Sequence, residues 1–316
     1  MNVELETAYI GIDCKGPDAV ATYLRDVVGL MPGEPAPGAA STWRDDGKAV
    51  RLWLQQAGCD DAACIGFEAT SVAAYDRVLA RLRLAGVDCS ALTTEQKTLR
   101  GVQDGVSMAT PWGVPLDVVQ GLAEAKTPFA SEHYPQGFVT RGQGFGHFVF
   151  VVNTPEAYEA SRRFAIDVLG LKLSDWLRMP MGPVEMNVSF FHCNPRHHSI
   201  AIAFVPMPAV PQKLHHVNFE VAQVAAVGAA YERALRTSTP LANTIGQHDN
   251  DGMISFYSVS PGGWRVEIGA TGRVVGDDWN DVREYDRISR WGHQPPEVLT
   301  QMLSAGHPAT TGEAIP

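Results

Sequence analysis

The sequence lacks any apolar stretch near the roughly 18 residues that a membrane-spanning helix needs. Its start, MNVELETAYIGID, has neither the basic beginning nor the apolar centre of a secretion signal. Basic residues are in deficit, with 25 Lys and Arg against 35 Asp and Glu, so the net charge is -10. Such a chain offers no electrostatic footprint for nucleic acid or an anionic membrane. We therefore expect a cytoplasmic protein that binds neither.

Cysteine is also scarce and irregularly spaced. The five cysteines are Cys14, Cys59, Cys64, Cys89 and Cys193. An odd number without a repeating interval predicts reduced thiols in a cytosol. No second Cys or His pair follows Cys59 and Cys64 at the spacing of a zinc site. With 316 residues, 45% hydrophobic and 19% charged, the chain has the profile of one large or two ordinary globular domains.

The chain repeats one pattern, a strand-like run followed by an amphipathic helix. The strand-like runs lie at 8–13, 64–70, 146–152 and 215–221. The helical patterns that follow lie at 18–30, 71–86, 154–171 and 223–237. Short β-type runs and apolar residues at three-to-four spacing are the signatures of these two elements. Thr154-Pro155-Glu156 is a good helix start.

A hairpin pattern closes the second and fourth copies of this repeat. Residues 107–121 align with 257–270, and both copies carry Pro and Gly between two β runs. The unit is therefore βαβββ and occurs four times. We expect an α+β protein of two domains, each with two modules that form an incomplete barrel of strands with helices outside.

The domain boundaries follow from these repeats. The predicted organisation is an N-terminal domain without metal at 1–121, a linker at 122–144, a C-terminal metal-binding domain at 145–295 and a tail at 296–316. The linker is rich in Gly, Pro, Ser and Thr and has no periodicity. The tail ends in small and polar residues, and we expect its last ten residues to be mobile.

No histidine occurs before His133, although the chain has ten. Aligning the four strand starts places Ala8 and Ile65 in the first two units at the positions of His147 and His216 in the last two. The second half has therefore gathered histidines at strand positions where the first half has none.

A carboxylate joins them. Glu267 stands in the apolar run WRVEIG, where the second unit has Asp117. A carboxylate in an apolar strand is costly unless it is paired or binds a metal. A single histidine at a strand start is more often structural than a ligand, but His147, His216 and Glu267 can converge inside a small barrel. Two imidazoles and one carboxylate form the facial triad of non-haem iron(II) oxygenases, which leaves three positions open.

Further titratable groups lie near this triad. The segment 190–204 predicts a hairpin with Asn194-Pro195-Arg196 in its turn and His192, His197 and His198 beside it. We expect His192 and His197 to be solvent-facing turn residues. A histidine can carry a proton near neutral pH, and a tyrosine hydroxyl can donate a hydrogen bond to a phenolate.

A motif in the fourth unit identifies a family. It comprises Gly246, His248, Phe256-Tyr257, Pro261, Gly263 and Glu267. With these residues at these spacings the chain resembles the type I extradiol dioxygenases of the vicinal oxygen chelate superfamily. The resemblance extends from ETAYIGID near the N-terminus to RWGH at 290–293. Ser260 departs from the family, which usually has an acidic, amide, Thr or Ala residue there.

The resemblance implies a ligand set and a cofactor. Carried over by position, the iron ligands fall on His147, His216 and Glu267. His215 is the competing choice for the second ligand, and the alignment of GHFVFVV with HHVNFEV favours His216. The implied metal is Fe(II), although Mn(II) accepts the same donors.

The same resemblance implies the other site residues. The acid–base histidine falls on His198, and His248 and Tyr257 match groups that hydrogen-bond substrate and dioxygen species. The positions that line the substrate pocket fall on Val149, Phe190, Asn250 and Asp251.

The implied reaction is extradiol cleavage of a catechol-type aromatic diol by O₂. In chain length, in the HH-containing hairpin and in the WGH tail the sequence resembles enzymes that act on bicyclic catechols, so a dihydroxybiphenyl, dihydroxynaphthalene or steroid catechol is expected over simple catechol. A glyoxalase-type isomerase would draw ligands from more of the units, and a non-catalytic binding module would need no triad. The family also implies a homo-oligomer.

Overall fold

The computed structural model describes residues 3–181, 184–206 and 212–297, and most of the predicted tail lies outside them. The first unit comprises β1 (Leu5–Cys14), α1 (Pro17–Tyr23), a π-helical turn η1 (Leu24–Val28), β2 (Met31–Pro32), β3 (Ser41–Arg44) and β4 (Leu52–Gln56). The second comprises β5 (Asp61–Ala69), α2 (Val72–Leu84), β6 (Cys89–Ala91), α3 (Thr94–Arg100), β7 (Asp104–Met108) and β8 (Leu116–Gln120).

The third unit comprises β9 (His147–Val152), α4 (Pro155–Arg163), the π-helical turn η2 (Phe164–Val168), β10 (Lys172–Met181), β11 (Val184–His192) and β12 (Ile200–Phe204). The fourth comprises β13 (Leu214–Glu220), α5 (Val224–Arg236), β14 (Leu241–His248), β15 (Ile254–Val259) and β16 (Arg265–Ala270). The predicted βαβββ order is confirmed in all four units, and α3 is an addition within the second.

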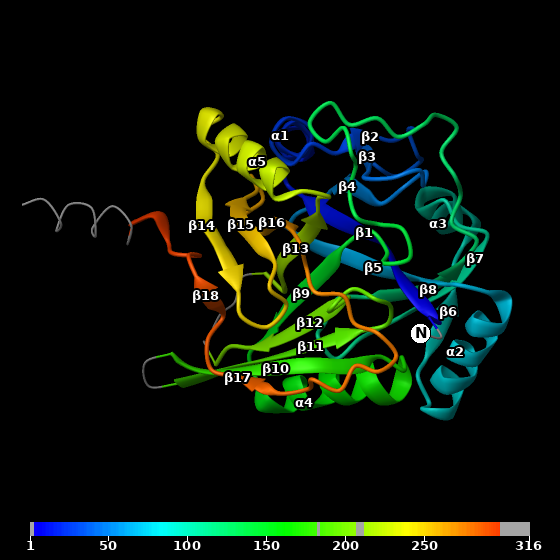
Figure 1. Cartoon of the computed structure of the whole chain (residues 1–316). Coiled ribbons are helices and arrows are strands. Elements are labelled where there is room, and N and C mark those ends of the chain that lie inside the picture. The colour runs from blue at the N-terminus through cyan, green and yellow to red at the C-terminus, as the bar shows by residue number, and fades with distance from the viewer. Residues whose placement is uncertain (1–2, 182–183, 207–211, 298–316) are drawn as a thin grey trace, which may run out of the picture.

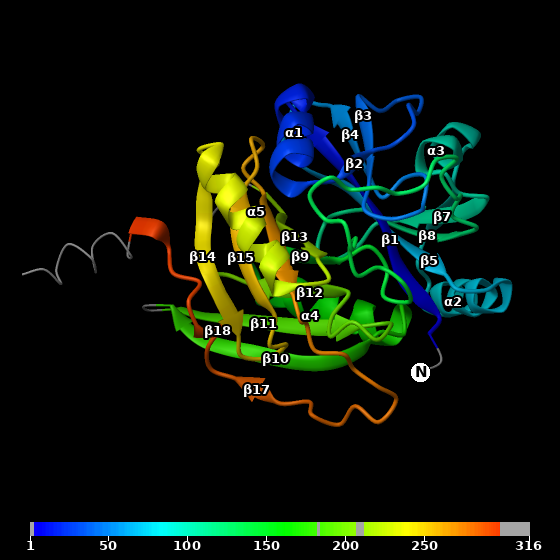
Figure 2. The ribbon, with the colours of Figure 1, turned by 45° about the horizontal axis from the view of Figure 1, so that its top comes forward.

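The four units pair into two curled sheets (Figures 1 and 2). The strand order is β2-β3-β4-β1-β5-β8-β7-β6 in the first sheet and β17-β10-β11-β12-β9-β13-β16-β15-β14-β18 in the second. In each sheet the first strands of two units pair antiparallel at the centre, β1 with β5 and β9 with β13. The vicinal oxygen chelate fold expected from the sequence is confirmed.

Two short strands after the fourth unit cross the open side of the second sheet. β17 (Glu284–Tyr285) pairs with β10 and β18 (Ser289–Trp291) pairs with β14, at opposite edges of the same sheet. Since only three residues separate them, the segment 284–291 spans the gap that the incomplete barrel leaves (Figure 1). It therefore covers whatever lies inside the sheet.

Helix starts and the core follow from local chemistry. The Thr154 side chain accepts a hydrogen bond from the backbone N–H of Ala157, and Pro155 opens α4, as the sequence predicts. The helices pack on the outer faces of the strands, α2 on β5 and β8, and α5 on β15 and β16. Between the sheets, Phe67 and Phe148 meet edge to face with ring centroids 6.5 Å apart, so the two sheets share one continuous core.

The strand register corrects one alignment made from the sequence. His147 pairs with Asn218, which pairs with Glu267. The corresponding path in the first sheet runs from Tyr9 to Gly66 to Asp117. Tyr9 and Cys64, rather than Ala8 and Ile65, therefore occupy the positions of His147 and His216. A bulge between Thr7 and Tyr9 shifts β1 by one residue, and a one-residue shift exchanges the faces of a strand.

The interior of the first sheet is filled by an ion pair and an aromatic cluster. The Arg100 Nε donates to Asp117 Oδ2 at 2.6 Å, and the Tyr9 hydroxyl donates to the same oxygen at 2.9 Å. Trp53 stacks at a tilt beside Tyr9, with centroids 5.3 Å apart, and is 1% exposed. A guanidinium thus neutralises the carboxylate that corresponds to Glu267.

We expect Arg100→Ala to lower the free energy of unfolding by about 3–5 kcal/mol, because Asp117 would keep a buried charge without its partner. Urea unfolding followed by circular dichroism measures this. The matched control is Lys97→Ala, which removes a partly exposed pair with Asp104 and should cost less than about 1 kcal/mol. Equal losses for the two variants would contradict a structural role for the buried pair.

Candidate active site

Three neighbouring strands bring the predicted triad together. His147 begins β9, His216 lies in β13 and Glu267 lies in β16, and β13 pairs with both of the others. The Nε2 atoms of His147 and His216 lie 3.2 Å apart. Glu267 Oε2 lies 3.2 Å from the former and 3.4 Å from the latter. All three residues are buried.

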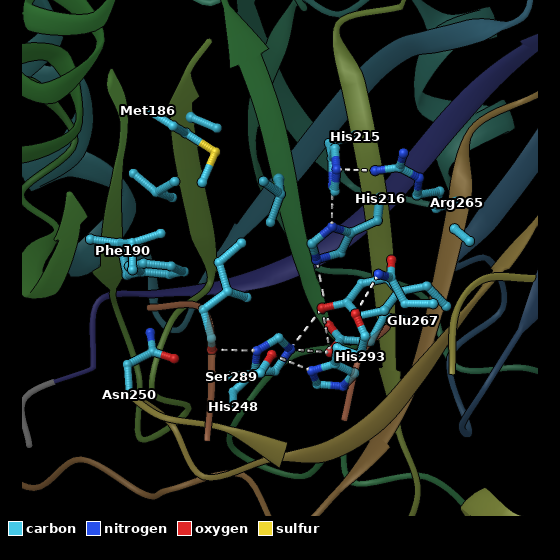
Figure 3. A pocket seen from close by; sticks show the side chains of 18 of the residues that line it. Met186, Phe190, His215, His216, His248, Asn250, Arg265, Glu267, Ser289 and His293 are labelled. Atoms are coloured by element: carbon cyan, nitrogen blue, oxygen red, sulfur yellow. Dashed lines mark hydrogen bonds and ion pairs between the residues drawn. The ribbon is translucent and has the colours of Figure 1, made fainter. Parts of the chain in front are cut away.

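A bulge in β13 determines which histidine reaches this point. The pairing of β13 with β9 shifts between Leu214 and His216. His216 therefore turns its Nε2 to the cluster, while His215 touches His216 through the two Nδ1 atoms at 2.7 Å and extends toward Arg265 (Figure 3). The structure thus brings His216 and not His215 to Glu267.

The carboxylate at the centre is held ionised. Burial alone would raise the pKa of Glu267, but hydrogen bonds from His147, His216 and His248 hold it well below its usual range. The Ser255 hydroxyl donates to Oε1 at 2.6 Å, and the Asn218 amide donates to Oε2 at 3.1 Å. These donors fix the orientation of the carboxylate.

The two histidines of the cluster are held neutral. Burial lowers the pKa of His147 to about 4 despite its contact with Glu267, and burial also lowers the pKa of His216. Metal ions bind the neutral imidazole, so neither residue has to release a proton near pH 7.

This donor set fits one divalent metal ion. Two ligand atoms about 2.1 Å from an ion and at right angles to each other lie about 3.0 Å apart. The separations of 3.2–3.4 Å among the three donor atoms are close to that value. Among the described residues, His147, His216 and Glu267 are one of two groups of potential ligands close enough to hold a metal.

His248 and Tyr257 lie on one side of the carboxylate. The Tyr257 hydroxyl donates to Glu267 Oε1 at 2.8 Å, and His248 Nε2 lies 2.8 Å from that hydroxyl. Burial alone would lower the pKa of His248, yet its contact with Glu267 and the charge of Asp251 raise it to about 9. Burial and the charge of Glu267 raise the pKa of Tyr257 well above its ordinary value, so the phenol stays protonated.

His198 lies on the other side of the cluster. Its ring centroid is 3.9 Å from that of His147, and its Nδ1 lies 3.9 Å from Asp251. Burial and the neighbouring His147 and His197 hold the pKa of His198 well below its usual range. It comes from the loop of the β11–β12 hairpin, as the sequence predicts.

The prediction that His192 and His197 face solvent is wrong, since each is only 2% exposed. His197 Nε2 lies 3.1 Å from Asp175, and Trp279 packs edge to face on its ring. His192 Nδ1 lies 2.7 Å from the Ser174 hydroxyl. The segment that follows β16 covers the hairpin loop, and nothing in the hairpin sequence indicates that cover.

A cavity of about 390 Å³ opens beside the triad (Figure 3). The four residues predicted to contact substrate all line it: Val149, Phe190, Asn250 and Asp251. Its apolar wall continues through Val151, Leu177, Met186, Val188 and Ala203. Arg287, Ile288 and Ser289 of the crossing segment close its open side.

Sequence reasoning missed several groups at this site. Ser255 binds Glu267, and His293 Nε2 lies 3.1 Å from the Ser255 hydroxyl. Ser255 gives no signal in the sequence, whereas the RWGH motif marks His293 without indicating its position. Gly246 permits this position of His293, because a Cβ at residue 246 would lie 2.4 Å from the backbone nitrogen of His293.

Comparison with known proteins agrees with this fold and site. Residues 144–268 match the family model described as the Glyoxalase/Bleomycin resistance protein/Dioxygenase superfamily. The chain is 38% identical to the biphenyl-2,3-diol 1,2-dioxygenase of Metapseudomonas furukawaii, over 90% of this chain and 92% of that protein. It is 36% identical to an iron-dependent extradiol dioxygenase of Rhodococcus jostii (strain RHA1), over 90% and 95% of the two chains.

A solved structure shows the same likeness. The crystal structure of a halotolerant catechol dioxygenase superimposes with a TM-score of 0.82 at 28% identity, covering 92% of this chain and 94% of that one. The chain belongs to the vicinal oxygen chelate superfamily that the family model describes. Within it, the chain belongs to the extradiol ring-cleavage dioxygenases, which are oxidoreductases.

Among the described residues, no helix is both long and apolar enough to cross a membrane.

The lowered pKa of His147 predicts how metal binding depends on pH. His147 stays neutral until the pH approaches about 4, so at this ligand protons compete with the metal only as the pH falls toward that value. We expect iron to remain bound at pH 5 and to be lost as the pH falls through 4, as measured by metal analysis after anaerobic gel filtration at each pH. Loss centred near pH 6.5 would show that the histidines titrate like exposed ones.

Proposed function

We propose that this protein cleaves the ring of a bicyclic catechol with O₂, in aromatic hydrocarbon catabolism, at an Fe(II) ion held by His147, His216 and Glu267. The observation that carries the proposal is the convergence of three donor atoms, 3.2–3.4 Å apart, beside an apolar cavity. Glu267 supplies one negative charge and the histidines none, so a divalent ion keeps a net positive charge for an anionic diol.

Fe(II) is the proposed metal, and Mn(II) fits the same two imidazoles and carboxylate. When bound, the metal supplies open coordination positions at which a diol and dioxygen can be brought together. The surrounding residues then decide orientation and proton movement.

His198 is the proposed acid–base group. Its Nδ1 lies 3.2 Å from His197 Nδ1 and faces Asp251, which leaves Nε2 to exchange a proton with the substrate. Its low pKa supports a neutral imidazole that can accept a proton from a diol hydroxyl and return it later in the reaction.

His248 and Tyr257 are the proposed hydrogen-bond donors to the bound oxygens. Tyr257 stays a phenol and His248 stays protonated at neutral pH, and both lie on the same side of Glu267. Their donors now reach Glu267 Oε1, and a bound oxygen would have to accept from them in its place. Donors placed where negative charge develops stabilise it without reorganisation.

The size of the cavity supports a bicyclic substrate. An apolar cavity of about 150 Å³ accommodates one benzene ring. The cavity beside the triad measures about 390 Å³, which leaves room for a second ring against Val149, Phe190 and their apolar neighbours. Asn250 and Asp251 supply polar groups on its wall.

We expect the iron-loaded enzyme to consume one O₂ per biphenyl-2,3-diol. We also expect a kcat/KM at least about tenfold above that for catechol, because the second ring buries additional apolar area. An oxygen electrode combined with the yellow absorbance of the product measures both. Equal or better turnover of catechol would favour the monocyclic alternative. No uptake with either diol would overturn ring cleavage and favour an isomerase or a binding module.

Removing a ligand should abolish both iron binding and turnover. We expect His147→Ala and Glu267→Gln to bind iron substoichiometrically and to lose oxygen uptake, because each removes one of the three donors. The matched control is His133→Ala, a histidine outside the cavity, which should keep both properties. Full iron content with full activity in either ligand variant would remove that residue from the proposed triad.

Replacing His198 should separate binding from proton transfer. We expect His198→Gln to lower kcat by about 10²–10⁴ while iron content and the anaerobic dissociation constant of the diol stay unchanged. Stopped-flow turnover and anaerobic spectral titration measure these quantities. A change confined to KM would assign His198 to binding alone.

Two further features of the protein are proposals. Its location in the cytoplasm is inferred from its few, irregularly spaced cysteines, and its assembly into a homo-oligomer is inferred from its resemblance to the family.

A further inference from the structure

One arginine of the substrate cavity has no anionic partner. Arg265 opens β16 two residues before Glu267, so both side chains lie on the same face of the sheet. It lines the cavity, and in Figure 3 it lies beside His215, across the view from Met186 and Phe190.

Arg265 is half-buried, and two fully buried arginines of the described chain have oxygen acceptors. Arg100 pairs with Asp117 at 2.6 Å, and Arg44 donates to the Thr127 carbonyl at 2.8 Å. Within the described residues, Arg265 has no carboxylate within 4.0 Å, and its only hydrogen-bond partner is His215 Nε2.

His215 cannot compensate this charge. An imidazole carries no negative charge, and Arg265 reaches it only through the contact of its Nη1 with His215 Nε2. A guanidinium has five N–H donors, so an anion in the cavity can accept hydrogen bonds from the others.

Arg287 provides the internal comparison. It lines the same cavity, but its guanidinium already donates to Asp249 at 2.6 Å and its side chain is 60% exposed. The two arginines of the cavity thus differ in whether their charge is already satisfied.

We propose that Arg265, which lies beside His215, forms an anion-binding subsite within the cavity, and that the physiological substrate is a catechol carrying a carboxylate. This inference rests on the proposed function. Residues two apart on a strand are separated by roughly 6.6 Å, so the carboxylate sits about one ring away from the diol that binds near Glu267. The planar guanidinium matches a carboxylate in a two-bond geometry.

The test compares two kinds of probe on anaerobic, iron-loaded enzyme. One is biphenyl-2,3-diol, and the other is the same diol with a carboxylate at the ortho, meta or para position of its second ring. Dissociation constants are measured for the wild type, Arg265→Gln, Arg265→Lys and the control Arg287→Gln. We expect the wild type to bind at least one carboxylated isomer about 10- to 100-fold more tightly than the neutral diol.

In Arg265→Gln this preference should disappear, while the neutral diol binds within about twofold of the wild type. Arg265→Lys should keep part of the preference, since lysine retains the positive charge but lacks the paired, planar N–H donors that bind both oxygens of a carboxylate. Arg287→Gln should keep all of it. If Arg265→Gln fails to fold, Arg265→Lys decides, and an unchanged ratio in that variant overturns the proposal.

The inference is also overturned if the wild type shows no preference, or if the preference survives in Arg265→Gln or is lost equally in Arg287→Gln. Oxygen uptake by the wild type with the neutral diol is recorded separately. Absence of oxygen uptake would contradict the proposed ring cleavage. The ratio of dissociation constants measured without air would still decide whether the subsite exists.

Discussion

The buried carboxylate of Glu267 is the constraint on which the rest of the site depends. At 1% exposure, an ionised carboxylate survives only if donors or a cation surround it. The second sheet meets that requirement with His147 and His216 on Oε2, and with Ser255 and Tyr257 on Oε1. The same donors that stabilise the charge also orient it toward one face, where a metal ion can complete the neutralisation.

The first sheet meets the same constraint in another way. Asp117 occupies the register position of Glu267, but Arg100 neutralises it and Trp53 fills the adjacent space. One repeated frame therefore supports two buried carboxylates, one closed by a guanidinium and one left beside a cavity. A glyoxalase-type isomerase would need metal ligands from more units. The first sheet offers none, because Tyr9 contacts Asp117 and Cys64 contacts Arg100, so the Arg100 guanidinium already takes the place that a metal ion would need.

The fold and the candidate ligands could be read from the sequence because both leave periodic marks. Four β–α repeats predicted four units, and the family motif from Gly246 to Glu267 located the site. The strand register could not be read from the sequence. A bulge near Thr7 changes which side chains of β1 point to each face of the sheet, and it leaves no change in the apolar pattern. The burial of His192 and His197 was missed because a segment more than 70 residues away covers them.

The sequence by itself determined the element order, the absence of histidine from the first two units and a set of candidate donors, since these depend on local periodicity and residue type. Only the tertiary structure decided how a bulge in β13 turns His216 toward Glu267, how the segment 284–291 closes the cavity and that Arg265 lacks an anionic partner. These features depend on bulges and on contacts between distant segments. Such contacts form only when the whole chain has folded, so no local pattern encodes them.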